Sequence, residues 1–306
     1  MKITLKGDRH LGAVIGHKEF RHEYVAGKVK GWIKDVEELS QVAKEEPQLD
    51  YSAFTKGLSH RWTYVQRTIP DISSLFIPLE KAIRHTLIPA IFGRELSDLE
   101  RSIVALPLRF GGLAIQNPVL TADQEFKASN EITSGLKLMI YKQDMNLENL
   151  DKSEISSKKQ SLKNTKEAKL KEEFEHLLKQ LPTPRLRALQ EASQKGASSW
   201  LSALPLRRLG YCLNKAEFRD AIALRYCWPI TDIHSHCACG SKNDIDHVLV
   251  CKLGGYVTFR HNALRDTEAE LLREVCKDVK RSPHFYLQTG RIIRQAPLPR
   301  IKQDWI

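Results

Sequence analysis

Apolar residues recur every three to four positions over much of this 306-residue chain, and this spacing constrains its fold more than any other feature. Repetition at that period places one apolar stripe along a helix, where it usually covers a core rather than a ligand. The first series follows Phe20 and consists of Val25, Val29, Trp32, Val36, Leu39 and Ala43. A second series follows Pro47 and predicts a second helix beside the first; its members are Tyr51, Phe54, Leu58, Trp62 and Val65.

Local signals predict where further helices begin. Ser97 and Glu100 have the spacing of a capping box, in which each side chain accepts a hydrogen bond from the backbone amide of the other residue. Thr121 and Gln124 have the same spacing and predict the start of a later helix. Asn214 is a favourable N-cap for the helix expected after it. Nearly all of the chain beyond its first residues is therefore expected to be helical.

Three segments depart from this pattern. Residues 3–15 alternate short apolar runs with glycines and predict a β-hairpin. Residues 109–118 combine two glycines with apolar residues and a proline, and they predict an ordered turn. Residues 143–180 mix Lys and Glu with few aromatic side chains, so they predict a solvated helix or hinge and the chief domain boundary.

The charge balance favours a polyanionic partner. The chain has a net charge of +11 and an isoelectric point near 9.3, and each phosphate that a cation neutralises releases counterions. The alternative is a basic surface without a specific partner. No apolar run approaches the roughly 18 to 20 residues that a membrane span needs, and residues 1–16 carry no secretory signal. We expect an intracellular protein, in the nucleus or the cytoplasm, with no membrane partner.

A short Cys/His cluster is the sharpest sign of chemistry. It follows the spacing C-x-C-x7-H-x3-C, and its members are Cys237, Cys239, His247 and Cys251. Zinc takes four sulfur and nitrogen donors in a tetrahedron, and a closed set of four predicts a structural Zn2+ rather than a catalytic one. The one-residue gap between the first two cysteines is short, so His234 or His236 could replace Cys237. The alternative is a loop of reduced thiols without metal.

The remaining cysteines are expected to be small buried hydrophobic residues on helices, and they are Cys212, Cys227 and Cys276. Six cysteines are too few for a disulfide-rich scaffold of this length. Because the cytosol and the nucleus keep thiols reduced, clustered cysteines there favour metal binding over disulfides.

These elements predict a mainly α-helical fold with a short N-terminal β-hairpin, a helical bundle, and a small zinc-knuckle region with flanking helices. A chain of 306 residues suffices for one large domain or two smaller ones. The expected segments are a hairpin with a helical bundle at 1–140, a charged helical linker at 141–195, a zinc-knuckle domain at 196–280 and a poorly ordered basic tail at 281–306.

Basic side chains in these segments are candidates for contact with phosphates. Two lie in the second helix and three follow the cysteine cluster: Arg61, Arg67, Arg260, His261 and Arg265. Acidic residues along the later helix dilute its charge, so a helix that only packs is the alternative there. The sequence contains no phosphate-binding glycine loop, serine-hydrolase elbow or zinc-protease helix. We therefore expect no catalysis by this chain alone.

Three motifs, in this order along the chain, carry a resemblance to a known family. Residues 7–16, GDRHLGAVIG, resemble the primer-grip hairpin that follows the catalytic carboxylates of non-LTR (LINE-type) reverse transcriptases. Residues 106–118, which include Gly111-Gly112-Leu113, are similar to a segment downstream of the thumb in those enzymes. The cysteine cluster and the glycines after it resemble their CCHC zinc knuckle. The resemblance covers most of residues 3–280.

The resemblance implies a helical thumb at residues 17–140 that grips template and primer, and a knuckle region that positions nucleic acid. It also implies that Arg9 and His10 of the hairpin contact nucleic acid. The paired aspartates of the polymerase would lie just before residue 1, and the last residues contain no recognisable nuclease. We therefore expect an RNA- or DNA-binding C-terminal fragment without polymerase or endonuclease activity, with the polymerase palm as a further partner in trans.

Two alternatives to this function remain open. A host zinc-binding nucleic-acid adaptor would have to fold stably without the palm. A structural or interaction protein would carry its charge incidentally, and its affinity for partners would depend little on salt. Apolar residues of the hairpin left unpaired by loss of the palm would favour aggregation over either role.

Overall fold

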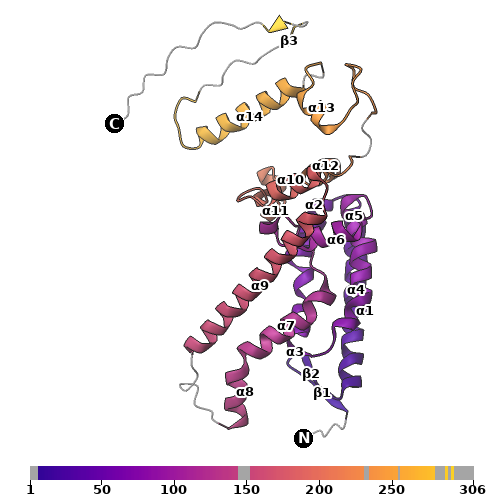
Figure 1. The fold of residues 1–306 in the computed structure, drawn as a ribbon, viewed down its shortest axis with the longest axis vertical. Coiled ribbons are helices and arrows are strands. Elements are labelled where there is room, and N and C mark those ends of the chain that lie inside the picture. The colour runs from indigo at the N-terminus through magenta and orange to yellow at the C-terminus, as the bar shows by residue number, and fades with distance from the viewer. Residues whose placement is uncertain are drawn as a thin grey trace, which may run out of the picture. The chain divides into compact units, whose positions relative to one another are not determined.

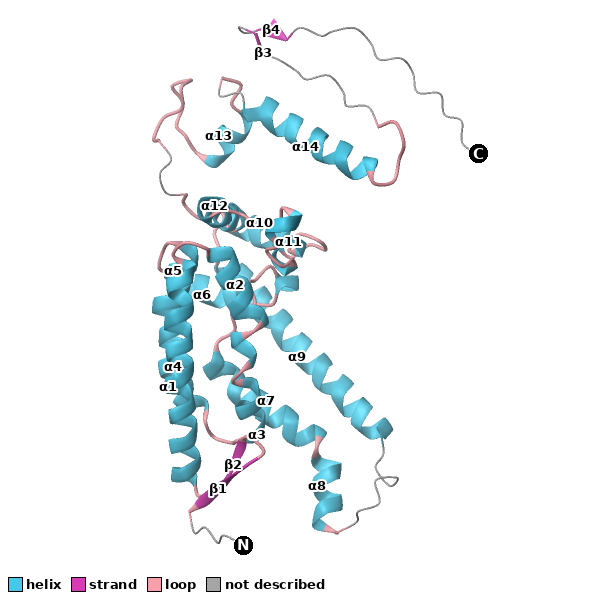
Figure 2. Cartoon of the chain, turned by 180° about the vertical axis from the view of Figure 1, so that it is seen from behind, coloured by secondary structure: helices cyan, strands magenta, loops and turns pink. Residues whose placement is uncertain are grey.

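The computed structural model describes residues 6–143, 152–230, 234–253, 256–279, 287–288 and 291–292. The chain forms two compact units, Met1–Pro229 and Ile230–Ile306. Helices make up most of the described residues, and a two-stranded hairpin precedes them in the first unit (Figures 1 and 2). The predicted fold class is therefore confirmed.

The first unit begins with β1 (Gly7–His10) and β2 (Ala13–Gly16). Its helices are α1 (Lys18–Ala43), α2 (Pro47–Lys56), α3 (Thr63–Thr68), α4 (Ile77–Ala82), α5 (Ile88–Phe92), α6 (Asp98–Ala105), α7 (Pro118–Ile132), α8 (Ser134–Tyr141), α9 (Lys152–Gln180), α10 (Thr183–Ala192), α11 (Ser199–Ser202) and α12 (Lys215–Arg225). A π-helical turn joins α4 to α5, and short 3-10 turns lie at Leu58–His60, Ser73–Phe76, Leu108–Phe110 and Arg207–Leu209.

Two tyrosines hold the hairpin turn against the helices. β1 and β2 pair antiparallel, and their two-residue turn has positive φ at Leu11 (48°) and Gly12 (83°), as a type I′ turn requires. Tyr24 of α1 donates a hydrogen bond to the Gly12 carbonyl at 2.8 Å, and Tyr64 of α3 donates one to the Leu11 carbonyl at 2.7 Å. The predicted hairpin is confirmed over Gly7–Gly16, and its expected first residues lie outside the described chain.

The apolar stripe of α1 lies in the core, as its spacing predicts. The buried members of the predicted stripe are Val25, Val29, Trp32, Val36 and Ala43. The Trp32 ring stacks on Phe76 with centroids 6.1 Å apart and meets Trp62 edge-on at 6.0 Å. Aromatic pairs in such arrangements add about 0.5 to 1.5 kcal/mol each beyond the area that they bury. This cluster therefore anchors α1 to the segments that follow it.

The second predicted helix is divided into two, which corrects the expectation of one continuous helix. Gly57 ends α2 with φ −127° and ψ −78°, outside the helical region, and a 3-10 turn separates it from α3. The apolar side chains of both pieces are still buried: Tyr51, Phe54, Trp62 and Val65. The break turns the chain so that Phe54 and Trp62 meet, with ring centroids 6.1 Å apart. Tertiary packing overrides the helical period at this glycine.

The start of α7 is also corrected. The helix begins at Pro118 rather than at Thr121, because the Asn117 side chain caps it and a proline suits the first helical position. The Thr121 hydroxyl instead bonds backward to carbonyls of its own first turn. The caps predicted at Ser97 and Asn214 are both confirmed as complete capping boxes.

The double-glycine segment is the ordered turn that its sequence predicts, and other elements bond to its backbone. Gly111 adopts a left-handed φ of 75°. Its carbonyl accepts hydrogen bonds from the hydroxyl of Tyr226 at 2.7 Å and from the guanidinium of Arg225 at 3.2 Å. A Cβ atom at Gly112 would lie only 2.0 Å from the carbonyl oxygen of Leu106. Both glycines are therefore required by geometry.

The first unit extends further along the chain than predicted. Residues Lys152–Gln180 form a helix, one of the two forms expected, but this helix is tied to the bundle: the Phe174 ring meets Phe110 with centroids 5.5 Å apart. Phe218 of α12 is fully buried and its ring meets Tyr51 of α2 at 6.0 Å. The division therefore falls after Pro229, whereas the sequence suggested a separate linker and grouped residues 196–229 with the knuckle.

The second unit contains the cysteine cluster, α13 (Ile245–Val250) and α14 (Tyr256–Arg273). Strands β3 (Leu287–Gln288) and β4 (Arg291–Ile292) pair antiparallel, and they are all that the structure describes of the predicted basic tail at 281–306. Among the described helices of both units, none is long and apolar enough to cross a membrane.

Candidate metal centre

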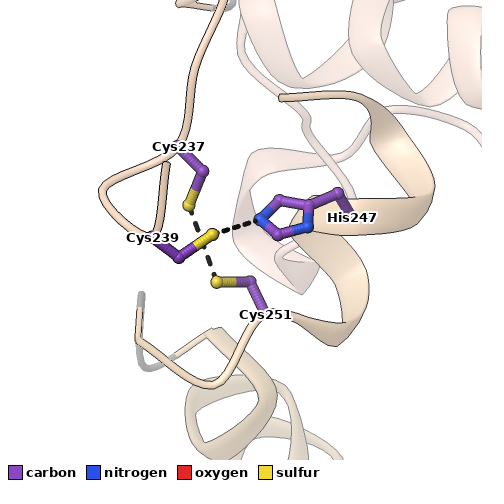
Figure 3. Close-up of side chains that lie close together, drawn as sticks. All are labelled: Cys237, Cys239, His247 and Cys251. Atoms are coloured by element: carbon purple, nitrogen blue, oxygen red, sulfur yellow. Dashed lines mark hydrogen bonds between the residues drawn. The ribbon is translucent and has the colours of Figure 1, made fainter. Parts of the chain in front are cut away.

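A tight turn presents the first two cysteines of the cluster. The Gly240 amide donates a hydrogen bond to the Cys237 carbonyl at 2.8 Å, and the Cys237 amide donates one to the Ser241 carbonyl at 2.9 Å. Gly240 adopts a φ of 83°, a conformation that glycine tolerates at no steric cost. These hydrogen bonds reverse the direction of the backbone directly after Cys239. The thiols of Cys237 and Cys239 therefore lie close together (Figure 3).

Helix α13 presents the other two residues. The Asp244 carboxylate caps this helix by accepting a hydrogen bond from the His247 amide at 2.8 Å. The Cys251 amide donates one to the His247 carbonyl at 2.8 Å, which closes the last turn of the helix at its C-cap residue Cys251. Residues four positions apart lie on the same side of a helix, so the imidazole and the thiol project together.

The four side chains converge on one point (Figure 3). Their ligand atoms all lie within 4.8 Å of one another, and they come from Cys237, Cys239, His247 and Cys251. The Sγ atoms of Cys237 and Cys251 are 3.6 Å apart, and the Cys239 Sγ lies 3.1 Å from the His247 Nε2. A tetrahedral site with bonds of about 2.0 to 2.3 Å has edges of about 3.3 to 3.8 Å. This cluster can therefore hold one metal ion.

The surroundings of Cys239 favour its thiolate. Hydrogen bonds from Ser241, first from its hydroxyl and then from its backbone amide, lower the pKa of the Cys239 thiol to about 6. The thiolate is the form of cysteine that binds metals, and metal binding must displace the proton from any thiol that still carries one. At neutral pH Cys239 therefore needs little or no proton loss to act as a ligand.

The two alternative ligands lie outside this cluster. His234 and His236 are both exposed, and the His236 Nδ1 lies 3.1 Å from the Ser235 hydroxyl. The converging group contains Cys237 instead. The one-residue gap before Cys239 thus does not prevent both thiols from reaching the same point.

The prediction for the other three cysteines is wrong, because none of them is buried. Cys212 is half-buried, and Cys227 and Cys276 are exposed. Cys227 has a left-handed φ of 51° just beyond the end of α12, and Cys276 lies beyond the end of α14. Both therefore lie past the helices on which burial was expected.

Two of the predicted phosphate-binding arginines are held in ion pairs within the first unit. Arg61 contacts Asp35 of α1 at 2.5 Å, and Arg67 contacts Glu125 of α7 at 2.8 Å. Both guanidinium side chains stay more than half exposed, at 59% and 57%. A phosphate would have to compete with a carboxylate for each of these arginines. This competition lowers the binding free energy that each arginine could contribute.

The predicted basic residues of α14 also differ in their surroundings. Arg260 and His261 are exposed, as contact with a phosphate requires. The Arg265 side chain is only 10% exposed and pairs with Asp266 at 2.8 Å, which corrects its expected place on a phosphate-reachable surface. The carboxylate of Asp266, the next residue, is thus the partner of this guanidinium, in place of the phosphate predicted from the sequence.

A cation–π cluster joins the hairpin to α1. The Arg9 guanidinium lies 5.6 Å from the centroid of the Tyr24 ring, and the Lys28 ammonium lies 5.7 Å from it. Within the described part of the chain, neither cation forms an ion pair with a carboxylate. His10 beside them is exposed. Arg9 and His10 were predicted from the sequence, whereas Tyr24 and Lys28 were not, although their four-residue spacing on α1 places them on the same side of the helix.

Comparisons with known proteins add no assignment to this geometry. No protein-family model matches the chain, and no curated protein or solved structure shows a significant match to it. Interpretation of the site therefore rests on its own residues and their chemistry.

A single substitution in the cluster should abolish metal binding. We expect purified chain to hold one Zn2+, and Cys239→Ser to hold none under the same dialysis, because the remaining three donors leave the tetrahedron open. Cys276→Ser is the matched control, since this exposed thiol lies in the same unit outside the cluster. Metal content is measured by mass spectrometry of the metal or by a chromogenic chelator. Equal zinc in the wild type and Cys239→Ser would refute the four-ligand assignment.

Proposed function

We propose that this chain binds nucleic acid through a zinc knuckle in its second unit and a basic hairpin in its first, as the C-terminal part of a LINE-type reverse transcriptase. The observation that carries the proposal is the convergence of three thiols and one imidazole into a closed set of four. A closed set leaves no position for a substrate, so the metal would be structural. Small zinc knuckles are among the common modules that bind RNA. The proposal assigns a binding role and no catalytic step.

Zinc is the metal that best suits these donors. Soft thiolates with one imidazole in a tetrahedron favour Zn2+ over Mg2+, Ca2+ or Mn2+, which prefer oxygen. The second unit also has a small core: of its described side chains, only Cys251 and Ala269 are buried. A unit with so few buried groups gains much of its folding free energy from metal binding. Chelation should therefore unfold it.

The cation–π cluster at the hairpin supports a phosphate-binding surface in the first unit. Arg9 and Lys28 approach the same Tyr24 ring without a carboxylate partner among the described residues, so both charges are available to an external anion. Tyr24 and Tyr64 hold the hairpin turn through their hydrogen bonds to its carbonyls. This preorganisation limits the conformational entropy that the hairpin loses on binding. The net charge of +11 adds long-range attraction for a polyanion.

Salt dependence of binding tests this function. We expect the zinc-loaded chain to bind a single-stranded RNA and a primer–template duplex with an affinity that falls steeply as salt rises. Replacing Arg9 and Lys28 together with alanine should weaken binding about tenfold and reduce the slope of log K against log salt by about 1.4 to 1.8, the effect of two phosphate contacts. Fluorescence anisotropy at several salt concentrations measures both quantities.

The matched control is Lys34→Ala. Lys34 lies on the same helix but pairs with Glu38 at 3.5 Å, so its loss should change the affinity and the slope little. An affinity that does not vary with salt would exclude nucleic-acid binding and leave a role in protein interaction. If the double substitution leaves both the affinity and the salt slope unchanged, the phosphate contacts lie away from the hairpin.

A further inference from the structure

The metal cluster contains two sulfur atoms that are placed to react with each other. The Sγ atoms of Cys237 and Cys251 are 3.6 Å apart, and a disulfide bond would bring them to about 2.05 Å. The third thiol contacts the imidazole instead, since the Cys239 Sγ lies 3.1 Å from the His247 Nε2 (Figure 3). The geometry therefore favours one sulfur pair over the other pairings of these cysteines.

Both members of this pair lie where the backbone can adjust. Neither Cys237 nor Cys251 lies within a helix or strand: the first opens the turn that the Gly240 amide closes, and the second is the C-cap residue of α13. A sulfur movement of about 1.5 Å therefore does not have to break a helix or strand. A bridge from Cys237 to Cys239 would instead close over the single residue Ala238 inside the tight turn.

The cluster is also within reach of a small oxidant. Cys237 and Cys239 are half-buried rather than enclosed, so hydrogen peroxide can meet the thiols from solvent. Cysteine binds zinc as the thiolate, and the thiolate is also the form that peroxides oxidise. The residues that hold the metal are thus the residues that an oxidant attacks.

We propose that the cluster is a redox switch, in which hydrogen peroxide joins Cys237 to Cys251 and releases the zinc; the inference rests on the proposed zinc site. One of the two thiolates attacks a peroxide oxygen, which forms a sulfenic acid and releases hydroxide. The other thiolate attacks that sulfur, forms the disulfide and releases a second hydroxide. The thiolates lose two electrons, and the peroxide with two protons from solvent becomes two molecules of water. Cys239 and His247 remain, and two donors do not complete the tetrahedron that zinc requires.

Release of the metal would act on the whole second unit. Of its described side chains, only Cys251 and Ala269 are buried, so little core remains to keep the unit folded without zinc. Thiols reduce disulfides by exchange, and reduction restores all four ligands. Oxidation and reduction would therefore interconvert a metal-free, unfolded second unit and a zinc-bound, folded one.

The test uses the full zinc-loaded chain, in which the cysteines outside the cluster are first replaced: Cys212→Ser, Cys227→Ser and Cys276→Ser. Hydrogen peroxide should release one zinc per chain to a chromogenic chelator and lower the mass of the chain by two hydrogen atoms. Tryptic cleavage after Lys242 separates Cys251 from the other two cysteines, and alkylation should mark Cys239 as the remaining free thiol. Dithiothreitol with added zinc should restore the metal content.

Two matched variants test the pairing, because each keeps four zinc donors and changes one thiol to an imidazole. Cys239→His retains the proposed sulfur pair and should release zinc within about threefold of the parent rate, whereas Cys237→His should slow release at least about tenfold. Zinc content before oxidation shows whether each variant is folded. If either fails to load zinc, the mapped disulfide of the parent chain decides the pairing.

The outcomes separate the switch from the metal site. Equal release from both histidine variants, or a disulfide through Cys239, would overturn the proposed pair. A zinc-loaded chain that keeps its metal and its thiols under peroxide would overturn the switch alone. A chain that holds no zinc before oxidation would overturn the proposed metal site and the switch together.

Discussion

Gly112→Ala is expected to destabilise the first unit by more than about 3 kcal/mol. The new Cβ atom would lie 2.0 Å from the Leu106 carbonyl oxygen and 2.5 Å from its carbonyl carbon, and neither backbone atom can rotate away. The same carbonyl accepts a hydrogen bond from the Ala114 amide at 2.9 Å, so a backbone shift would also break this bond. A neighbouring carbonyl, that of Leu113, accepts the buried hydroxyl of Tyr51 at 3.0 Å, which couples the distortion to α2.

Urea unfolding followed by circular dichroism measures this effect, with Gly31→Ala as the matched control. Gly31 lies in α1 with nothing within 4 Å of its added Cβ, so alanine there should stabilise the protein by about 0.5 to 1 kcal/mol. The two variants make the same chemical change in opposite environments. A Gly112→Ala variant within about 1 kcal/mol of the wild type would show that the turn can relax, and would contradict its packed geometry.

Asp50→Asn is expected to raise stability at alkaline pH by up to about 6 kcal/mol. The Asp50 side chain is fully buried in α2, and neither carboxylate oxygen has a hydrogen-bond partner among the described residues. Burial raises the pKa of this carboxyl from 3.8 to about 8. Ionisation in the folded state therefore costs far more than in the unfolded state.

The sign of the pH dependence follows from that shift. Below pH 4 the carboxyl is protonated in both states, so it adds no penalty. Between pH 4 and about 8 only the unfolded state releases the proton, and the free energy of unfolding falls by about 1.4 kcal/mol per pH unit. Above about pH 8 the carboxyl is ionised in both states, so the free energy of unfolding no longer changes with its titration. The difference between Asp50→Asn and the wild type should therefore grow across this window and then stay constant.

Urea denaturation at a series of pH values measures that difference, and Asp123→Asn is the control. Asp123 is an exposed carboxyl on α7, so its replacement should leave the wild-type profile unchanged. Taking the difference between Asp50→Asn and the wild type removes the contribution of Glu100 and Glu125 to the pH dependence. The lowered pKa values of these two carboxyls add stability that is lost as pH falls. A constant difference between Asp50→Asn and the wild type from pH 4 to pH 9 would contradict a buried, unpaired carboxyl.

The features that the sequence predicted correctly depend on residues close together in the chain. Each capping box spans four residues, from Ser97 to Glu100 and from Asn214 to Glu217, and both are formed. The hairpin pairs residues at most nine positions apart, from Gly7 to Gly16. The four converging Cys and His side chains all fall between Cys237 and Cys251, so a single turn and one short helix suffice to bring them together. In each case the backbone has few ways to satisfy its local hydrogen bonds.

Two of the pairings that the sequence missed depend on partners far along the chain. Arg67 finds Glu125 fifty-eight positions later, and Phe218 reaches the ring of Tyr51 in α2, so neither pairing has a local signature.

The spacing of neighbouring residues by itself thus determined the mainly helical class, the hairpin, the capping boxes at Ser97 and Asn214, and the set of three cysteines and one histidine. Tertiary structure decided the break at Gly57, the extent of the first unit to Pro229, the burial of Asp50 and the carboxylate partners of Arg61 and Arg67. The physical reason is one of range. Turns and caps are settled by hydrogen bonds within a few residues, whereas burial and ion pairing depend on which distant surfaces meet when the core closes.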